Sequence, residues 1–388
     1  SMMNLDFSEQ ESAFRAECRG WLEANVPKES LPSGDTREGY ALHLEWERKL
    51  FDAGWSCVSW PKAYGGREAS LYEWLIFEEE YYRVRAPSRV TQNGIFLLAP
   101  TIFEFGTEAQ KQRILKPMAR GDLSIAQAWS EPNSGSDLAS LKSTAKRVDG
   151  GWLLTGQKTW STRGAFSDMA YGLFRTDPSK SRHHGLTYCL FPLTGEGVTV
   201  RGVDRLDGDE GFAELFLEDL FVPDENVIGE VNKGWEVAMA TTSSERGLSL
   251  RSPGRFMATA TRLIDLYRRY RETCEPALRD QVIDAWMGAE AYRWYTFKSV
   301  TDMLTGKPIG AESSLNKVFW SEMDVRTHET ALHILGQAQC LDEGSAAAAD
   351  EGAWIKGFQF ALAGPIYAGT NEIQRNIAAQ RVLGLPRG

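Results

Sequence analysis

The sequence lacks any apolar run long enough to cross a membrane. A transmembrane helix needs roughly 20 apolar residues, and the best runs here are short ones such as Ile95 to Pro100. No cationic segment followed by an apolar one stands at the start of the sequence, so a secretory signal is not predicted. We therefore expect a protein with no membrane span that resides in the cytoplasm.

Cysteine and histidine are also scarce, with 5 of each among 388 residues. The cysteines form no CxxC pair, which favours reduced core thiols over a disulfide framework. The histidines show no metal-ligand spacing, so no metal site is expected. Acidic residues outnumber basic ones by 53 to 43, and the net charge of −10 argues against nucleic acid as a partner. The cysteines are Cys18, Cys57, Cys189, Cys274 and Cys340.

Several common catalytic motifs are missing as well. The chain has no GxxxxGK(S/T) phosphate loop, no GxGxxG after a predicted strand, no GxSxG nucleophile elbow and no HExxH. Their absence argues against a P-loop nucleotidase, a Rossmann dehydrogenase, an α/β-hydrolase and a zinc protease.

What the chain does contain is a pattern that changes from helix to strand and back. From Ser8 to about Arg120, apolar residues recur every three or four positions, which predicts helices. Between Gly121 and Gly234, short β-rich runs alternate with turn residues, which indicates a compact antiparallel sandwich or barrel. The predicted strands are 152–155, 170–174, 186–191, 198–203 and 213–217.

Helical periodicity returns after Trp235 and predicts helices over 256–270, 280–303 and 315–335. Thr370 is placed to cap a last helix from Asn371 to about Leu383. We therefore expect a mostly α protein of the α+β class, with three domains spanning residues 1–120, 121–234 and 235–388.

Two separated segments carry polar and aromatic groups typical of a ligand site. Residues 129–137 (WSEPNSGSD) are rich in hydroxyls that can hydrogen-bond a polar heterocycle or a phosphate, although the same composition suits a loop between two domains. In residues 156–162, strand alternation places Trp160 and Thr162 on one face. That arrangement fits either a ligand-facing surface or a half-buried tryptophan in a sheet.

A third segment, residues 366–375, lies near the end of the chain. Gly369 lets a ligand approach the backbone, and the helix that Thr370 starts has a positive end that favours an anion. An ordinary capped helix explains the same residues.

Taken together, these segments resemble the acyl-CoA dehydrogenase flavoprotein family, over nearly the whole chain and in the family's order. The closing residues 380–387 resemble a bacterial branch that includes actinobacterial sterol-degrading members. The resemblance implies an N-terminal helical domain, a middle antiparallel β-barrel, a C-terminal four-helix-type bundle and FAD bound at a subunit interface. The matching segments are 61–66, 130–137, 157–160, 220–229, 369–370 and 374–375.

The resemblance also implies which residues bind FAD. Trp160 would pack on the flavin, Thr162 would donate to flavin N5, and Ser136 would also lie near the CoA. The cofactor-binding set is Gln127, Ser130, Ser136, Trp160, Thr162, Thr370 and Glu372.

The implied reaction is α,β-dehydrogenation of an acyl-CoA thioester. A carboxylate removes the α-proton while hydride leaves the β-carbon for flavin N5, and an electron-transfer flavoprotein takes the electrons onward. The backbone amide of Ala368 would stabilise the negative charge that develops on the thioester oxygen. Gly369, the next residue, would also contact the substrate.

Straight-chain members often carry the catalytic Glu just before the Gly-Thr pair, where this chain has Ala368. A second family pattern places the base on an earlier helix, directly before an Arg. Glu245 and Arg246 occupy that place, so we expect Glu245 to be the base and Arg246 a structural or CoA-side partner. The alternative is a Glu–Arg pair that serves helix packing alone.

Two departures concern the adenosine half of the FAD site. The family's Gln-x-x-Gly-Gly-x-Gly segment is represented by residues 333–339, which keep one glycine, and no Arg-x-x-Phe-Gly segment is recognisable between Arg268 and Ala289. The chain is therefore expected as a homodimer or homotetramer, or in a heterotetramer with a homologous subunit. A partner subunit with a shared flavin site and a flavin monooxygenase remain alternatives, and straight, branched, aromatic and steroid acyl groups all stay open.

Overall fold

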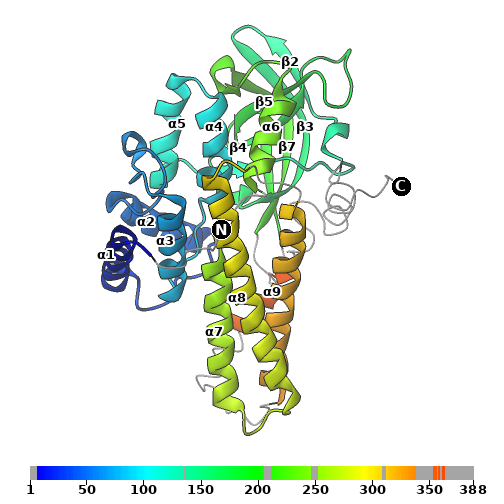
Figure 1. The fold of residues 1–388 in the computed structure, drawn as a ribbon. Coiled ribbons are helices and arrows are strands. Elements are labelled where there is room, and N and C mark those ends of the chain that lie inside the picture. Colours follow the sequence, from blue (N-terminus) through cyan, green and yellow to red (C-terminus); the bar gives the residue numbers. More distant parts are fainter. Residues whose placement is uncertain are drawn as a thin grey trace. The chain divides into compact units, whose positions relative to one another are not determined.

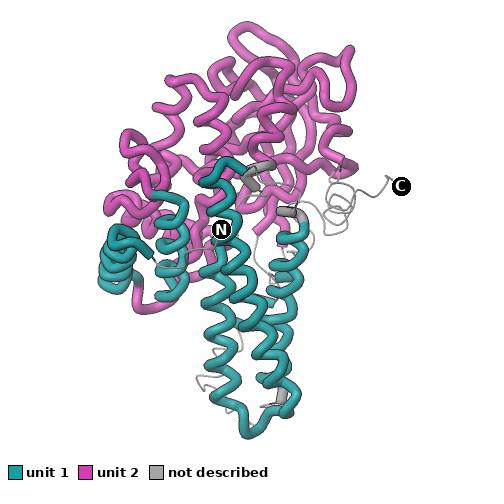
Figure 2. The backbone as a smooth tube through the Cα atoms, viewed as in Figure 1, with its two compact units in different colours: residues 1–26, 70–86, 246–388 teal, residues 27–69, 87–245 magenta. Residues whose placement is uncertain are grey.

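The computed structural model of the chain describes residues 7–134, 137–204, 211–245, 252–307 and 312–337, together with 353–355, 357–358 and 361–362. The chain divides into two units, each built from segments distant in sequence (Figure 2). Unit 1 comprises Ser1–Val26, Ser70–Ala86 and Arg246–Gly388, and unit 2 comprises Pro27–Ala69 and Pro87–Glu245. The described residues form a mixture of helix and sheet, as expected for the α+β class.

The described residues of unit 2 form a sheet of eight strands, and Figure 1 shows it with the helices of the same unit beside it. Seven of them follow the order β6-β7-β3-β2-β4-β5-β8, and β1 pairs in parallel with β4. All five predicted strands lie within observed ones, so this part of the prediction is confirmed. The strands are β1 (Ile125–Gln127), β2 (Thr144–Val148), β3 (Gly151–Thr162), β4 (Met169–Arg175), β5 (Leu186–Pro192), β6 (Val198–Val203), β7 (Phe212–Pro223) and β8 (Val227–Ile228).

Helices of unit 2 cover one face of this sheet. Because side chains alternate along a strand, Tyr171 and Tyr188 face the helices in one core cluster, whereas Phe174 and Phe191 lie in a second cluster formed by the strands. Val237 of α6 packs in the first cluster, which fixes this helix against β5. The helical elements of unit 2 are α2 (Arg37–Asp52), η1 (Lys62–Tyr64), η2 (Asn93–Leu98), α4 (Ala99–Phe105), α5 (Glu108–Arg120), η3 (Leu138–Ser140), η4 (Gly164–Phe166), η5 (Asp224–Asn226) and α6 (Gly234–Glu245).

Unit 1 is helical in its described residues. Capping boxes at Ser8 and Ser70 satisfy free amides at the starts of α1 and α3. The long helices α7, α8 and α9 contact one another along their lengths (Figure 1). The expected helices of this region are confirmed, except the last one after Thr370, which lies outside the described residues. The elements are α1 (Glu9–Asn25), α3 (Leu71–Arg83), α7 (Pro253–Tyr270), α8 (Ala277–Leu304) and α9 (Glu312–Gln337).

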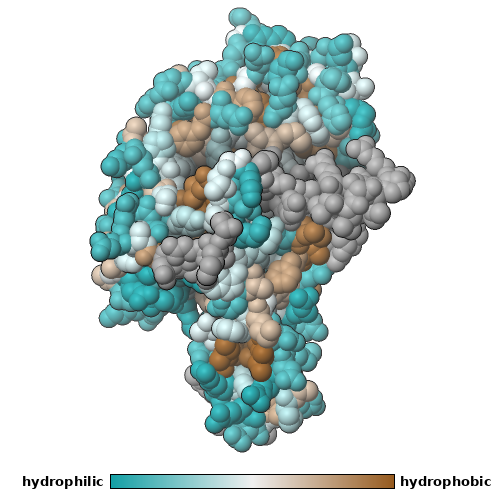
Figure 3. Space-filling model, viewed as in Figure 1, coloured by the Kyte–Doolittle hydropathy of each residue, from teal (hydrophilic) through white to brown (hydrophobic). Residues whose placement is uncertain are grey.

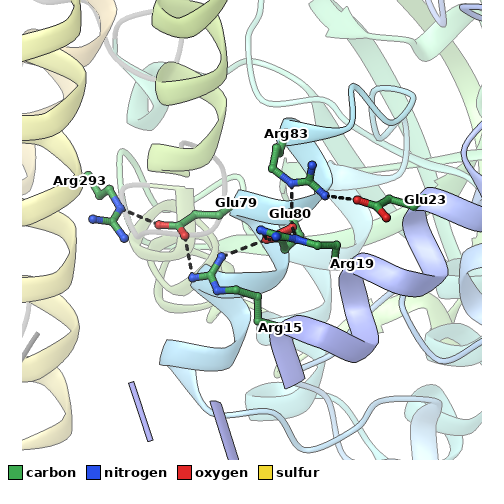
Figure 4. Close-up of polar contacts among 7 residues, drawn as sticks. All are labelled: Arg15, Arg19, Glu23, Glu79, Glu80, Arg83 and Arg293. Carbon is green, nitrogen blue, oxygen red and sulfur yellow. Dashed lines mark hydrogen bonds and ion pairs between the residues drawn. The ribbon is translucent and has the colours of Figure 1, made fainter. Parts of the chain in front are cut away.

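A network of charged side chains joins α1, α3 and α8 within unit 1 (Figure 4). Glu80 is 1% exposed and accepts hydrogen bonds from Arg15, Arg19 and Arg83. Glu79 bridges Arg15 at 2.9 Å and Arg293 at 2.7 Å. These ion pairs therefore connect α3 to both α1 and α8.

Two further expectations bear on the described residues. Cys18, Cys57 and Cys189 are buried free thiols, and Cys274 is a partly buried one. No described helix combines the length and apolarity that a membrane span requires.

Candidate active site

Strand β3 turns Trp160 out of the sheet. Trp160 has a φ of 58°, in the left-handed region, and its side chain is 65% exposed with its ring 5.6 Å from that of Phe212. The pairing of β3 with β7 shifts register between Lys158 and Ser161, so the strand bulges at this tryptophan. A left-handed conformation costs a bulky residue about 1–3 kcal/mol, so the surrounding contacts impose it. Trp160 is thus not the half-buried sheet tryptophan of the simpler interpretation.

The residues after Trp160 anchor the end of the strand. Ser161 is buried, and its hydroxyl donates to the Gln127 carbonyl at 2.8 Å. Thr162 pairs with Phe212 of β7 and ends β3. Arg163 then forms an ion pair with Asp35 at 2.9 Å.

The segment after β1 runs beside β3. Gln127 ends β1, and the Thr159 amide donates to the Ser130 carbonyl at 2.8 Å. These contacts bring together four residues that were predicted to bind FAD, from two neighbouring stretches of backbone. The four are Gln127, Ser130, Trp160 and Thr162.

A buried ion pair, not predicted from the sequence, joins the same two stretches. Lys158 Nζ lies 2.8 Å from Glu131 Oε2, and the two side chains are 0% and 6% exposed. Burial alone would raise the pKa of Glu131, but the Lys158 charge and hydrogen bonds from Lys158, Ser143 and the Lys142 amide hold that pKa below its usual range. Burial lowers the pKa of Lys158, against the attraction of Glu131. The only signal in the sequence was the position of both residues inside family-like segments.

Three buried polar atoms in the same two stretches of chain have no hydrogen-bond partner among the described residues. They are the indole nitrogen of Trp129 and the hydroxyls of Ser134 and Thr159. Leaving such a group unpaired costs about 1–3 kcal/mol. A ligand with several polar atoms would satisfy such groups, and the exposed face of Trp160 would suit a planar ring.

Helix α6 ends at Glu245 and is held by buried hydroxyls. Thr241 Oγ1 lies 2.6 Å from Thr101 Oγ1 and 3.0 Å from the hydroxyl of Tyr188. Burial raises the pKa of Tyr188, so its hydroxyl stays protonated and able to donate. Thr241 stands one turn before Glu245, whose own side chain lies outside the described residues.

Other predicted site residues also lie outside the described part of the chain. They are Ser136, Arg246, Ala368, Gly369, Thr370 and Glu372. Their assignments therefore stay predictions.

Comparison with known proteins gives the family. Residues 8–122, 126–220 and 232–383 match the models of the acyl-CoA dehydrogenase N-terminal, middle and C-terminal domains. The chain belongs to the acyl-CoA dehydrogenase family. The resemblance seen in the sequence is thus confirmed, and this acyl-CoA dehydrogenase is a flavoprotein oxidoreductase of lipid metabolism that uses FAD.

Individual relatives agree with this placement. Acyl-CoA dehydrogenase IpdE1 of Mycobacterium tuberculosis is 36% identical over 383 residues, which cover 96% of this chain and 97% of that protein. The structure of the Tcur3481-Tcur3483 steroid ACAD aligns with a TM-score of 0.88 at 26% identity, covering 100% of both chains. The ChsE4-ChsE5 complex from Mycobacterium tuberculosis aligns with a TM-score of 0.82 at 28% identity, again covering 100% of both chains.

The residues of the acyl-CoA dehydrogenase site fit FAD. The exposed indole of Trp160 offers a stacking surface, and the unpaired Trp129 nitrogen and Ser134 and Thr159 hydroxyls offer donors. A flavin has a planar ring and polar edge atoms, so an exposed indole and unpaired hydrogen-bonding groups suit it chemically.

Proposed function

We propose that this chain catalyses FAD-dependent α,β-dehydrogenation of an acyl-CoA thioester, with Glu245 as the base. The observation that carries the proposal is the outward-turned Trp160 next to Thr162, on a strand hydrogen-bonded to the Ser130 segment. Bound FAD would supply the acceptor for the hydride that leaves the substrate β-carbon. Ser136, Thr370 and Glu372 complete its contacts in this proposal.

The chain's own residues supply proton removal and orientation. Glu245 takes the α-proton, a role that requires a carboxylate shielded from water so that its pKa approaches the working pH. The Ala368 amide, beside Gly369, stabilises the charge that develops on the thioester oxygen. Ser136 and Arg246 bind the CoA portion.

Replacing Glu245 tests the assignment of the base. Glu245→Gln keeps the shape of the side chain but cannot take a proton, so we expect bound flavin with no bleaching when acyl-CoA is added anaerobically. Glu236→Gln, an exposed position on the same helix, serves as the matched control and should bleach normally. Normal bleaching by the Glu245→Gln variant would assign the base elsewhere.

For the acyl group, a steroid thioester is the first candidate to test. Two solved structures that align over 98% or more of this chain, at 26% identity, are described as a steroid ACAD. A panel of straight, branched, aromatic and steroid CoA thioesters, compared by kcat/KM, decides among the four classes. Higher kcat/KM for short straight chains would contradict this choice.

A partner subunit is the second candidate role. Residues 333–339 keep one glycine of the family's FAD segment, and two of the aligned structures carry paired names, Tcur3481-Tcur3483 and ChsE4-ChsE5. Helix α8 also exposes an apolar stripe at helical spacing, with Ile283, Trp286 and Met287 between 41% and 56% exposed. Figure 3 shows hydrophobic patches within a mainly hydrophilic surface.

The visible absorption spectrum of the purified chain separates the two roles. A stoichiometric flavin spectrum from the chain alone supports a homo-oligomer that completes its own site. A colourless protein that gains flavin only when a homologous chain is co-expressed supports the heterotetramer. Rapid reoxidation of the reduced flavin by oxygen would favour a monooxygenase over electron transfer to an electron-transfer flavoprotein.

We also infer the finer architecture from the family. The sheet of unit 2 would form the family's middle β-barrel (121–234), between an N-terminal helical domain (1–120) and a four-helix-type bundle (235–388). Cytoplasmic localisation likewise stays a prediction.

A further inference from the structure

We propose that Glu131 and Lys158 form a latch that holds the backbone at Lys142 and Ser143 beside Glu131, fixes both to strand β3, and thereby positions the flavin-contacting groups next to Glu131 and Lys158. The inference rests on the proposed function, because it takes Ser130 on one side, and Trp160 and Thr162 on the other, as flavin contacts. Glu131 and Lys158 themselves act as positioning residues.

Glu131 binds backbone amides that lie later in the chain. Its carboxylate accepts the Lys142 amide at 2.6 Å and the Ser143 amide at 3.2 Å, so one side chain holds two successive backbone amides. The carboxylate is 6% exposed. Because an unpaired polar group is costly in a buried site, these hydrogen bonds hold Lys142 and Ser143 beside Glu131.

Lys158 then fixes Glu131 to the sheet. Its ammonium is fully buried, donates to Glu131 at 2.8 Å and to the Leu173 carbonyl at 2.9 Å, and lies 4.8 Å from the centre of the Phe174 ring. Removing one member of a buried pair leaves an uncompensated charge. The ion pair therefore adds to the backbone hydrogen bond between Thr159 and Ser130 in holding strand β3 to the segment that begins at Ser130.

The latch also lies where β3 presents its functional side chains. The register shift against β7 begins at Lys158, the Thr159 amide reaches the Ser130 carbonyl, and Trp160 then takes its left-handed conformation. A lysine that moved out of its buried position would release the bulge that turns Trp160 outward.

The same unit contains a buried ion pair that serves as a control. Glu47 is 0% exposed, pairs with Arg89 and accepts the Thr91 amide at 3.1 Å, as Glu131 pairs with a cation and accepts backbone amides. Glu47→Gln and Glu131→Gln are thus matched substitutions. We expect both to lower the thermal unfolding midpoint of the full chain.

The decisive measurement is FAD affinity, from titration of the apoprotein at a temperature far below unfolding. We expect Glu131→Gln to raise the Kd for FAD by about tenfold or more and Glu47→Gln to leave it within about twofold of wild type. Equal FAD affinities in the Glu131→Gln and wild-type proteins would overturn the latch.

A double variant separates positioning from stability. Glu131→Gln with Lys158→Met removes the unpaired buried charge, so the unfolding midpoint should recover while FAD binding stays weak. If FAD affinity recovers together with stability, the effect of the single variant was structural and the latch is refuted.

Hydrogen exchange of the Lys142 and Ser143 amides gives a readout without flavin. Both should be protected in the wild-type apoprotein and exchange faster in Glu131→Gln. A wild-type chain that binds no FAD, alone or with a homologous partner, would defeat the proposed function. Unchanged exchange in Glu131→Gln would instead defeat the latch.

Discussion

Replacing Glu80 should destabilise unit 1 in a strongly pH-dependent way. Burial would raise the pKa of this carboxyl, but hydrogen bonds from Arg19, Arg83 and Arg15 override burial and lower it from 4.5 to about 2 (Figure 4). In the unfolded chain the carboxyl regains its ordinary value. The folded state therefore holds the ionised form of Glu80 more tightly than the unfolded state does.

The size of the effect follows from this difference. At about 1.36 kcal/mol for each tenfold change in proton affinity, the full shift corresponds to roughly 3 kcal/mol. Arg19 and Arg83 are 46% and 43% exposed, so water screens part of the attraction and about 1–2 kcal/mol is the better expectation. Because the folded pKa is the lower one, this stabilisation is present above pH 4.5 and disappears as the pH falls towards 2.

Urea unfolding followed by circular dichroism measures this contribution. At pH 7 Glu80→Gln should lose about 1–2 kcal/mol relative to wild type, and the gap should shrink steadily below about pH 4.5. Glu23→Gln is the control, since Glu23 pairs with Arg83 but is 55% exposed. A gap at pH 7 no larger than that of Glu23→Gln, or one that persists unchanged at pH 3, would refute the reasoning.

Two further substitutions probe unit 2. Thr241→Val removes the hydroxyl that lies 3.0 Å from the buried Tyr188 hydroxyl, so it should lower the free energy of unfolding by about 1–3 kcal/mol. It should also reduce kcat by a larger factor than it raises the Kd for FAD. Thr242→Val removes a hydrogen bond to the Ala238 carbonyl of its own helix, so it should lower the thermal unfolding midpoint much less. Equal decreases of the midpoint in the two variants would contradict this assignment. Gly156→Ala places a Cβ 2.0 Å from Ser143 Oγ. This clash should lower the free energy of unfolding by about 1–3 kcal/mol, which a lower thermal unfolding midpoint would report. Wild-type stability in Gly156→Ala would show that this region is loosely packed.

Most of the fold was predictable because periodicity reports burial directly. The run 198–203 coincides with β6, and Phe14, Cys18 and Leu22 line the buried face of α1 as their spacing requires. The assignment of α1 and α3 to one unit and of α2 and α5 to the other was not predictable. An amphipathic pattern shows which face of a helix is covered but not which element covers it.

The candidate site was predictable only where the residues form family-like segments. Trp160 and Thr162 lie in such a segment, but the left-handed backbone and register shift that turn Trp160 outward have no local signature in the sequence. A lysine in a strand is ordinarily taken as solvent-exposed. The burial of Lys158 depends on Glu131, which lies 27 residues earlier in the chain, and single-sequence reasoning cannot see that pairing.

The discontinuity of unit 1 affects how the chain folds during its synthesis. Helices α1 and α3 leave the ribosome early, yet α7 and α8, which both contact α3, are made more than one hundred and fifty residues later. At about 5–20 residues per second, α3 waits on the order of ten seconds or longer before α7 can cover the surface it contacts. The nascent protein is thus exposed to chaperone capture and aggregation during this interval. Truncated chains that end before α7 should therefore fold poorly.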